Sequence, residues 1–149
     1  MKVSDALAGV STIYLDAAPL VYYVEENPTY VKTMDVVIDL IENKPIQAFS
    51  SVILIPEVLM LPRRLGKTEL VKTYQAILLN SRAFQLKVVS LQIATQATDL
   101  RAQYNLRTPD ALHVATALET YCDAFLTNDL ELKRVTEIKV LVLDELEVS

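Results

Sequence analysis

The chain is poor in glycine: only Gly9 and Gly66 occur among its 149 residues. Neither the G-x-G-x-x-G dinucleotide fingerprint nor the G-x-x-x-x-G-K-[ST] phosphate loop can be written with two glycines at these positions. The G-x-S-x-G nucleophile elbow is absent as well. The sequence therefore excludes these nucleotide-binding loops and this class of serine hydrolase.

Histidine and cysteine are equally scarce, because His113 and Cys122 are the only ones in the chain. One of each is too few for a histidine- or cysteine-rich zinc site, and leaves little material for a serine-hydrolase triad. A single cysteine allows no internal disulfide and suits a reducing compartment, so we expect a cytoplasmic protein. Any chemistry must then depend on carboxylates.

Long apolar runs are also missing. No stretch reaches the roughly 18 apolar residues of a membrane span, and the start, MKVSDALAGVST, lacks the apolar core of a signal peptide. We therefore expect no contact with membranes. Because hydrophobic residues still make up 52% of the chain, a disordered protein is also excluded.

The net charge of −5 argues against a general nucleic-acid coat protein. It does not argue against a nuclease, because divalent cations would offset part of it locally. Several basic residues group along the chain, and they form either a solvated helix face or a set of phosphate contacts: Arg63, Arg64, Lys67, Lys72, Arg101 and Arg107.

Strand and helix signals alternate, which indicates a mostly parallel sheet covered on both faces, in one domain without linkers or repeats. Apolar runs predict strands over residues 12–15, 46–49, 84–89, 124–127 and 139–143. Helical periodicity predicts helices over residues 18–25, 30–43, 52–61, 67–80, 93–104 and 130–134. Pro62 and Gly66 are expected to separate two of them, and Thr108 and Pro109 to begin another, as hydroxyl cap and first helical residue.

Acidic residues stand just past apolar runs or at helix starts in four distant segments: Asp16, Glu57, Asp110 and Asp129. Each alone has an ordinary explanation as a helix cap or first-turn acid, except Glu57, whose apolar surroundings demand a partner. The carboxyl ends of parallel strands meet at one edge, so the four acids can lie together. A cluster of carboxylates repels itself unless a cation neutralises it, and magnesium prefers oxygen ligands. We therefore expect a metal site, and a raised pKa for at least one of these carboxyls without metal.

The segments around these acids resemble the PIN-domain family and, within it, the VapC-type toxin ribonucleases. The similarity lies in IYLDAAPLVYYVE (residues 13–25), SSVILIPEVL (50–59), LRTPDALHVATAL (106–118) and FLTNDLEL (125–132). Order and spacing agree from about residue 12 to residue 143. We therefore expect a PIN-like domain over residues 12–149, preceded by an N-terminal extension over residues 1–11.

The resemblance implies a three-layer α/β/α fold around a five-stranded, mostly parallel sheet. It implies an endoribonuclease that depends on Mg²⁺ or Mn²⁺ and cleaves RNA phosphodiester bonds by in-line attack of a metal-activated water. Asp16, Glu57, Asp110 and Asp129 would be both the catalytic and the metal-binding residues, and Thr127 and Asn128 would support them by hydrogen bonding. A VapB-type antitoxin and a homodimer are the partners that the resemblance implies, besides the RNA substrate.

Two positions depart from the family pattern: Ala18 replaces a frequent Asn or Ser, and Pro56 precedes Glu57. Two alternatives stay open. One is a standalone PIN nuclease acting in RNA processing or on structured DNA; the other is a non-catalytic binding or scaffold module, which the departure at Ala18 supports slightly. His113, three residues after Asp110, is interpreted as a helix-packing residue rather than a ligand. Tyr22 and Tyr23 are interpreted chiefly as core packing, with an apolar groove for a partner as the alternative.

Overall fold

The computed structural model describes residues 1–80 and 84–148. One sheet of five strands has the order β3-β2-β1-β4-β5, and every pair of neighbours is parallel. The strands are β1 (Thr12–Leu15), β2 (Gln47–Ser51), β3 (Phe84–Lys87), β4 (Ala124–Thr127) and β5 (Lys139–Val142). The predicted α/β fold around a five-stranded parallel sheet is confirmed. Residues 81–83 and 149 of the expected domain lie outside the described residues.

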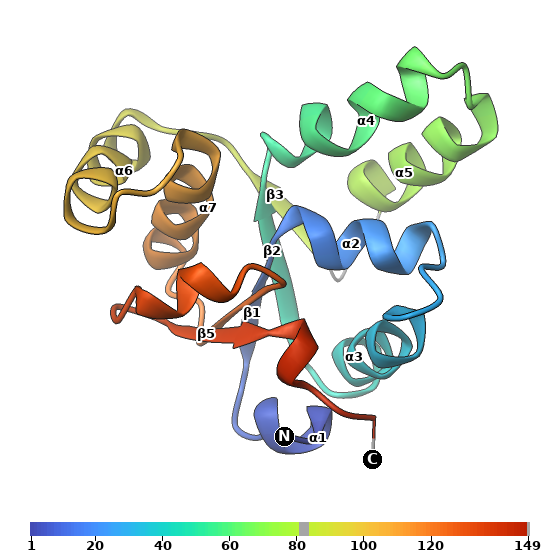
Figure 1. Cartoon of the computed structure of the whole chain (residues 1–149), viewed down its shortest axis with the longest axis horizontal. Coiled ribbons are helices and arrows are strands. Elements are labelled where there is room, and N and C mark those ends of the chain that lie inside the picture. Colours follow the sequence, from blue (N-terminus) through green and yellow to red (C-terminus); the bar gives the residue numbers. More distant parts are fainter. Residues whose placement is uncertain (81–83, 149) are drawn as a thin grey trace.

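Helices cover both faces of the sheet. Figure 1 shows α6 and α7 together on one side and α2 to α5 on the other, with α4 and α5 forming a pair that extends away from the sheet. The helices are α1 (Val3–Ala6), α2 (Ala17–Val24), α3 (Val31–Asn43), α4 (Leu54–Arg64), α5 (Thr68–Asn80), α6 (Leu91–Tyr104) and α7 (Thr108–Glu119), with the short 3-10 helices η1 (Leu130–Arg134) and η2 (Leu143–Glu145).

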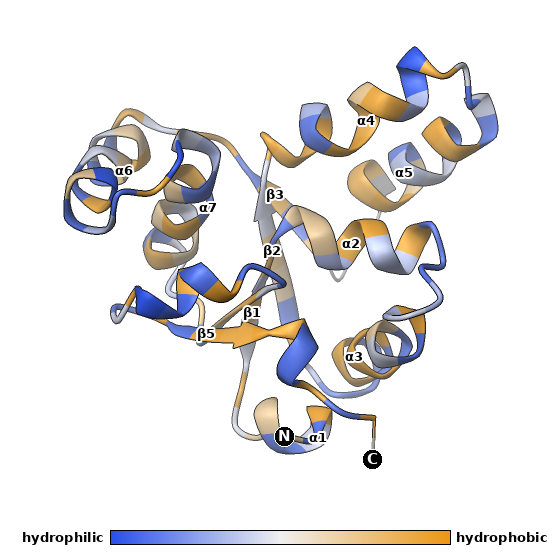
Figure 2. Ribbon diagram, in the orientation of Figure 1, coloured by the Kyte–Doolittle hydropathy of each residue, from blue (hydrophilic) through white to orange (hydrophobic). Residues whose placement is uncertain are grey.

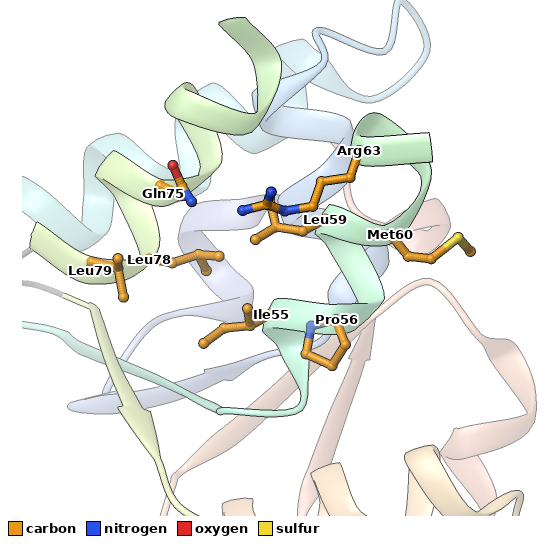
Figure 3. Close-up of a pocket in the computed structure, with 8 residues that line it drawn as sticks. All are labelled: Ile55, Pro56, Leu59, Met60, Arg63, Gln75, Leu78 and Leu79. Atoms are coloured by element: carbon orange, nitrogen blue, oxygen red, sulfur yellow. The ribbon is translucent and has the colours of Figure 1, made fainter. Parts of the chain in front are cut away.

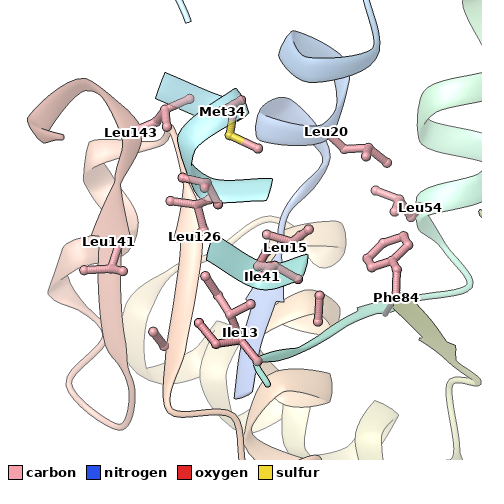
Figure 4. Close-up of a cluster of buried hydrophobic side chains, with 14 of the residues drawn as sticks. Ile13, Leu15, Leu20, Met34, Ile41, Leu54, Phe84, Leu126, Leu141 and Leu143 are labelled. Carbon is pink, nitrogen blue, oxygen red and sulfur yellow. The ribbon is translucent and has the colours of Figure 1, made fainter. Parts of the chain in front are cut away.

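The central strand β1 shows why three layers form. Successive side chains of a strand point to opposite faces, so Ile13 and Leu15 join one buried cluster while Tyr14 joins another. The first cluster lies between the sheet and α2 to α5, and Figure 4 shows Ile13 and Leu15 there beside Ile41 of α3. The second lies against α6 and α7, where the ring of Tyr14 stacks on Phe125 at 5.1 Å between centroids. Both faces of β1 are thus buried, as in other parallel sheets.

The expectation that Pro62 ends a helix is wrong. Pro62 lies inside α4, which continues to Arg64, and Gly66 follows with a positive φ of 66°. Pro62 is buried, so packing of this helix outweighs the loss of one backbone donor. The other proline, Pro56, lies in the first turn of α4, where a missing N–H costs little.

The start of α7 also differs from the prediction. Arg107, with φ −67° and ψ 153°, occupies the N-cap position, and no side chain caps the helix. Thr108 is therefore the first helical residue rather than the cap. The side chain of Arg107 instead donates a hydrogen bond to Asp110 in the first turn, which leaves the first backbone N–H groups of α7 without a side-chain cap.

Residues 1–11, expected to be an extension, pack into the first cluster through four side chains: Val3, Ala6, Leu7 and Val10. The amide of Val3 bonds to the carbonyl of Glu147 at 2.9 Å, so the two ends of the described chain lie together, as Figure 1 shows. Among the described residues, none of the helices has the length and apolar character needed to cross a membrane.

Candidate functional site

Four acidic side chains come from segments that begin or end at the carboxyl edge of the sheet. Asp16 follows β1 directly, and Asp129 comes two residues after β4, the neighbouring strand. Glu57 lies in the first turn of α4, which follows β2, and Asp110 lies in the first turn of α7. The parallel sheet brings these segments together because all its strands end on the same side.

Asp16 is held from two directions. Its Oδ1 accepts a hydrogen bond from the amide of Ala17 at 2.8 Å and so caps α2. Its Oδ2 accepts one from the hydroxyl of Thr127 at 2.8 Å. The same hydroxyl oxygen accepts a bond from the amide of Asp129 at 3.1 Å, and Asp129 caps η1 with its own side chain. Thr127 therefore connects Asp16 to the backbone of Asp129.

Glu57 contacts Asp16 through a histidine. His113 is fully buried, and its Nε2 lies 2.6 Å from Oε1 of Glu57 and 3.8 Å from Oδ1 of Asp16. Its other nitrogen, Nδ1, lies 2.6 Å from the hydroxyl of Tyr14. A carboxylate only accepts hydrogen bonds, so Nε2 carries a proton, and in the neutral ring Nδ1 accepts from Tyr14. The ring thus fixes Glu57 in one orientation.

Asp110 is the fourth acid, and a cation already contacts it. Nε of Arg107 donates to Oδ2 of Asp110 at 3.1 Å. Burial raises the pKa of Asp110, Arg107 lowers it, and the charges of Asp16 and Asp129 raise it further, with a net rise. The expected raised pKa is thus found at Asp110, although burial rather than charge repulsion is its largest cause. The three aspartates are close enough to influence one another electrostatically.

This arrangement can be compared with known proteins. The family model for the PIN domain matches residues 13–138. The chain belongs to the PIN domain family. No curated protein matches it at a significant level of sequence similarity.

Solved structures with the same fold as this PIN domain include toxin–antitoxin proteins. The crystal structure of VapBC2 from Rickettsia felis, bound to a promoter DNA fragment, matches with a TM-score of 0.70 and 15% identity, over 88% of this chain and 98% of that chain. A toxin–antitoxin complex from Klebsiella pneumoniae matches with a TM-score of 0.66 and 20% identity, over 88% of this chain and 97% of that chain. The sarcin-ricin loop cleaving toxin VapC20 of Mycobacterium tuberculosis matches with a TM-score of 0.64 and 16% identity, over 85% of this chain and 98% of that chain. At these identities the likeness concerns the fold.

Nucleases of the PIN family generally use divalent metals, so the question is whether the acidic side chains of this PIN domain are suited to bind one. Across residues 1–80 and 84–148, no three His, Cys, Asp or Glu side chains are already grouped to hold one. The donor chemistry nevertheless fits, because the four acids offer carboxylate oxygens, the ligands that Mg²⁺ and Mn²⁺ prefer. The charges of Asp16 and Asp129 contribute to the rise in the pKa of Asp110, and a nearby positive ion would offset this repulsion.

Two residues near the acids were not expected there. His113 does pack within α7 as interpreted, but it also lies between Glu57 and Asp16. Its spacing of three residues from Asp110 was a signal for a shared helix face. Arg107 was grouped with other basic residues, without a link to the acids. Asn128 was expected to support the acids by hydrogen bonding. In the described structure its Oδ1 accepts a bond from the amide of Asp144 at 2.9 Å, and its Nδ2 donates to the hydroxyl of Tyr22 at 3.5 Å.

Proposed function

We propose that this PIN domain is a metal-dependent endoribonuclease whose catalytic and metal-binding residues are Asp16, Glu57, Asp110 and Asp129. The main support is the convergence of four carboxylates from distant segments at one edge of the sheet, in a family of nucleases. Such a cluster destabilises the fold without a cation, since like charges in one site repel. A purely structural role gives no reason to assemble it.

The chain's own residues would hold and orient the reacting groups. Ala17 and Thr127 occupy one oxygen each of Asp16, and His113 fixes Glu57, so these carboxylates are already oriented. Thr127 supports the backbone of Asp129. A bound Mg²⁺ or Mn²⁺ ion would neutralise charge developing on the phosphoryl oxygens and make water easier to deprotonate.

The test is cleavage of a labelled RNA panel by the purified protein with Mg²⁺ or Mn²⁺. Asp16→Asn should abolish metal-dependent cleavage. Asp99→Asn is the matched control, because it removes the same charge from an exposed position on α6, and it should cut at the wild-type rate. Equal cutting by all three proteins would refute the assignment of the site.

Binding of metal can be tested without any substrate. At a Mn²⁺ concentration of about 100 times Kd, the ion should stabilise the fold by about 2.7 kcal/mol, which raises the melting temperature by roughly 5–10 °C. Asp16→Asn should lose this shift and Asp99→Asn should keep it. Absence of any shift and any cleavage would favour the non-catalytic scaffold.

We further propose that the chain is the toxin of a VapBC-type pair and forms a homodimer. Support comes from the structural neighbours and from an apolar groove of about 480 Å³ between α4 and α5. Figure 2 shows α4 as largely apolar, and the side chains of Met60 and Leu61 on this helix and of Leu65 directly after it are exposed. Figure 3 shows the side chains that line the groove: Ile55, Pro56, Leu59, Met60, Arg63, Gln75, Leu78 and Leu79.

The toxin role and the oligomeric state have separate tests. Induced expression should arrest growth of a host cell, and co-expression of a small DNA-binding protein encoded beside the gene should relieve the arrest. Light scattering should give twice the mass of the 16.7 kDa chain. RNA cleavage without growth arrest or a neighbouring partner gene would favour a standalone nuclease in RNA processing.

A further inference from the structure

The position of Arg107 is unusual for a residue that only stabilises a helix. N-cap positions favour short polar side chains, and a positive charge near the N-terminus of a helix opposes the helix dipole. Arg107 occupies the N-cap of α7 and gives no cap hydrogen bond. Its side chain is 79% exposed, and an ion pair with such an exposed partner adds little to stability. Neither capping nor the ion pair explains why an arginine stands here.

The contact with Asp110 leaves most of the guanidinium free. Only Nε of Arg107 bonds to Asp110, and within the part of the chain that the structure describes, neither Nη group has a partner. An arginine fork suits the two oxygens of a phosphate group. Arg107 therefore has unused donors that face solvent beside the candidate site.

The carboxylates that contact Arg107 electrostatically are those proposed to hold the metal. Nε of Arg107 lies 3.1 Å from Oδ2 of Asp110, and Asp129 lines the same small cleft. The guanidinium and a divalent ion would thus compete for Asp110. A bound ion would take this partner away and repel the arginine, because both carry positive charge.

The side chain of Arg107 lies at a small polar cleft in which it could contact a phosphate group. The cleft has a volume of about 80 Å³, and both carboxylates and guanidinium groups line it: Asn105, Leu106, Arg107, Asp110, Asp129, Glu131, Leu132 and Arg134. Arg134 is exposed, and no ion pair is found for it among the described residues. A phosphate of an RNA strand that reaches Asp110 and Asp129 would therefore come close to both arginines.

We propose that Arg107 is a substrate-binding residue that rests on Asp110 and moves to a phosphate of the RNA backbone when a divalent ion binds. The inference rests on the proposed function, because it assumes metal binding at these acids. The contacts of the Arg107 side chain would then change whenever metal binds to the site.

The first test measures Mn²⁺ affinity by calorimetry, without RNA. Arg107→Ala should bind Mn²⁺ roughly two- to fivefold more tightly than wild type, the change that follows from losing an exposed ion pair. Arg134→Ala is the matched control, because it removes an equal charge from the same cleft without touching Asp110. Its affinity should change less. Equal tightening in both variants would overturn the proposal.

The second test follows the side chain itself in the wild-type protein, by NMR of the arginine Nε–Hε groups. The Arg107 signal should shift during a Mg²⁺ titration, and shift again when dimethyl phosphate, a simple phosphodiester, is added to the Mg²⁺-saturated protein. An Arg107 signal that ignores Mg²⁺, or that ignores dimethyl phosphate afterwards, would overturn the proposal. Failure of wild type and all variants to bind either metal would instead overturn the proposed function on which it rests.

Discussion

Replacing His113 with leucine tests how the candidate site is built into the core. His113 and Tyr14 are both fully buried, and Nδ1 lies 2.6 Å from the tyrosine hydroxyl. Leucine fills much of the same space, so the change mainly removes hydrogen bonds. Leaving a buried hydroxyl without its partner costs about 1–3 kcal/mol. The hydroxyls of Ser50 and Thr116 are also close to Tyr14, so we expect about 1–2 kcal/mol from this contact.

Glu57 adds little to this cost, because its side chain is 30% exposed and water can replace the histidine. The loss should appear as a fall in the melting temperature of about 2–8 °C. Urea unfolding with an unchanged m-value would show that the effect is on stability rather than on the compactness of the unfolded chain.

A double-mutant cycle separates the hydrogen bond from packing. Tyr14→Phe removes the hydroxyl and leaves Nδ1 of His113 without a donor, so it should cost about 1–3 kcal/mol. In the double variant neither group remains, and the total loss should be smaller than the sum of the single losses by about 1 kcal/mol or more. Additivity within about 0.5 kcal/mol would refute the view that this bond anchors the histidine.

Three further substitutions probe other contacts. Asp123 accepts bonds from two amides at the start of β1, and these lower its pKa. Asp123→Asn should therefore lower the urea midpoint at pH 7. The difference from wild type should begin to shrink as the pH falls through about 4, the ordinary pKa of an aspartate, and vanish only below the lowered pKa of Asp123. The hydroxyl of Tyr74 donates a hydrogen bond to Glu25, so Tyr74→Phe should destabilise the fold by about 1–3 kcal/mol at pH 7. Burial and Glu25 raise the pKa of Tyr74, so wild type should lose stability above about pH 10, where the unfolded tyrosine ionises, and the difference between the two proteins should narrow there. Thr127→Val leaves one oxygen of Asp16 without its donor and should cost about 1–2 kcal/mol and weaken Mn²⁺ binding, which calorimetry would measure. An unchanged urea midpoint in Asp123→Asn or Tyr74→Phe, or an unchanged Mn²⁺ affinity in Thr127→Val, would contradict the prediction for that variant.

The strands could be predicted well because local apolar runs determine them. Strands β1 and β4 match the predicted residues 12–15 and 124–127, since both are short apolar runs that end at a polar residue. Pro62 could not be interpreted from local sequence, because its effect depends on how tightly the rest of α4 packs. The end of β5 was overestimated by one residue, because Leu143 is equally apolar but begins η2.

Partners of the acids were harder to predict than the acids themselves. The position of an acid after a strand follows from the chain, and the parallel sheet then brings the acids together. The bond between Tyr14 and His113 joins residues 99 positions apart, one on a strand of the sheet and the other on a helix that covers it. Spacing along α7 shows which residues share a face, but it does not say which strand residue lies opposite. The pairing of Arg107 with Asp110, by contrast, follows from ordinary helical spacing and was detectable.

The two interpretations of Asp16, as helix cap and as site residue, are not alternatives in this structure. Capping fixes the orientation of the carboxylate without neutralising its charge, so one residue can do both. Asparagine caps a helix about as well as aspartate, whereas alanine does not, at a typical cost of about 1 kcal/mol. Asp16→Ala should therefore be less stable than Asp16→Asn by about that amount, while both lose Mn²⁺ binding and RNA cleavage. Comparison of their urea midpoints with their Mn²⁺ affinities separates the two roles. If Asp16→Asn kept wild-type affinity for Mn²⁺, the charge of Asp16 would serve the helix alone, and the metal would have to bind elsewhere.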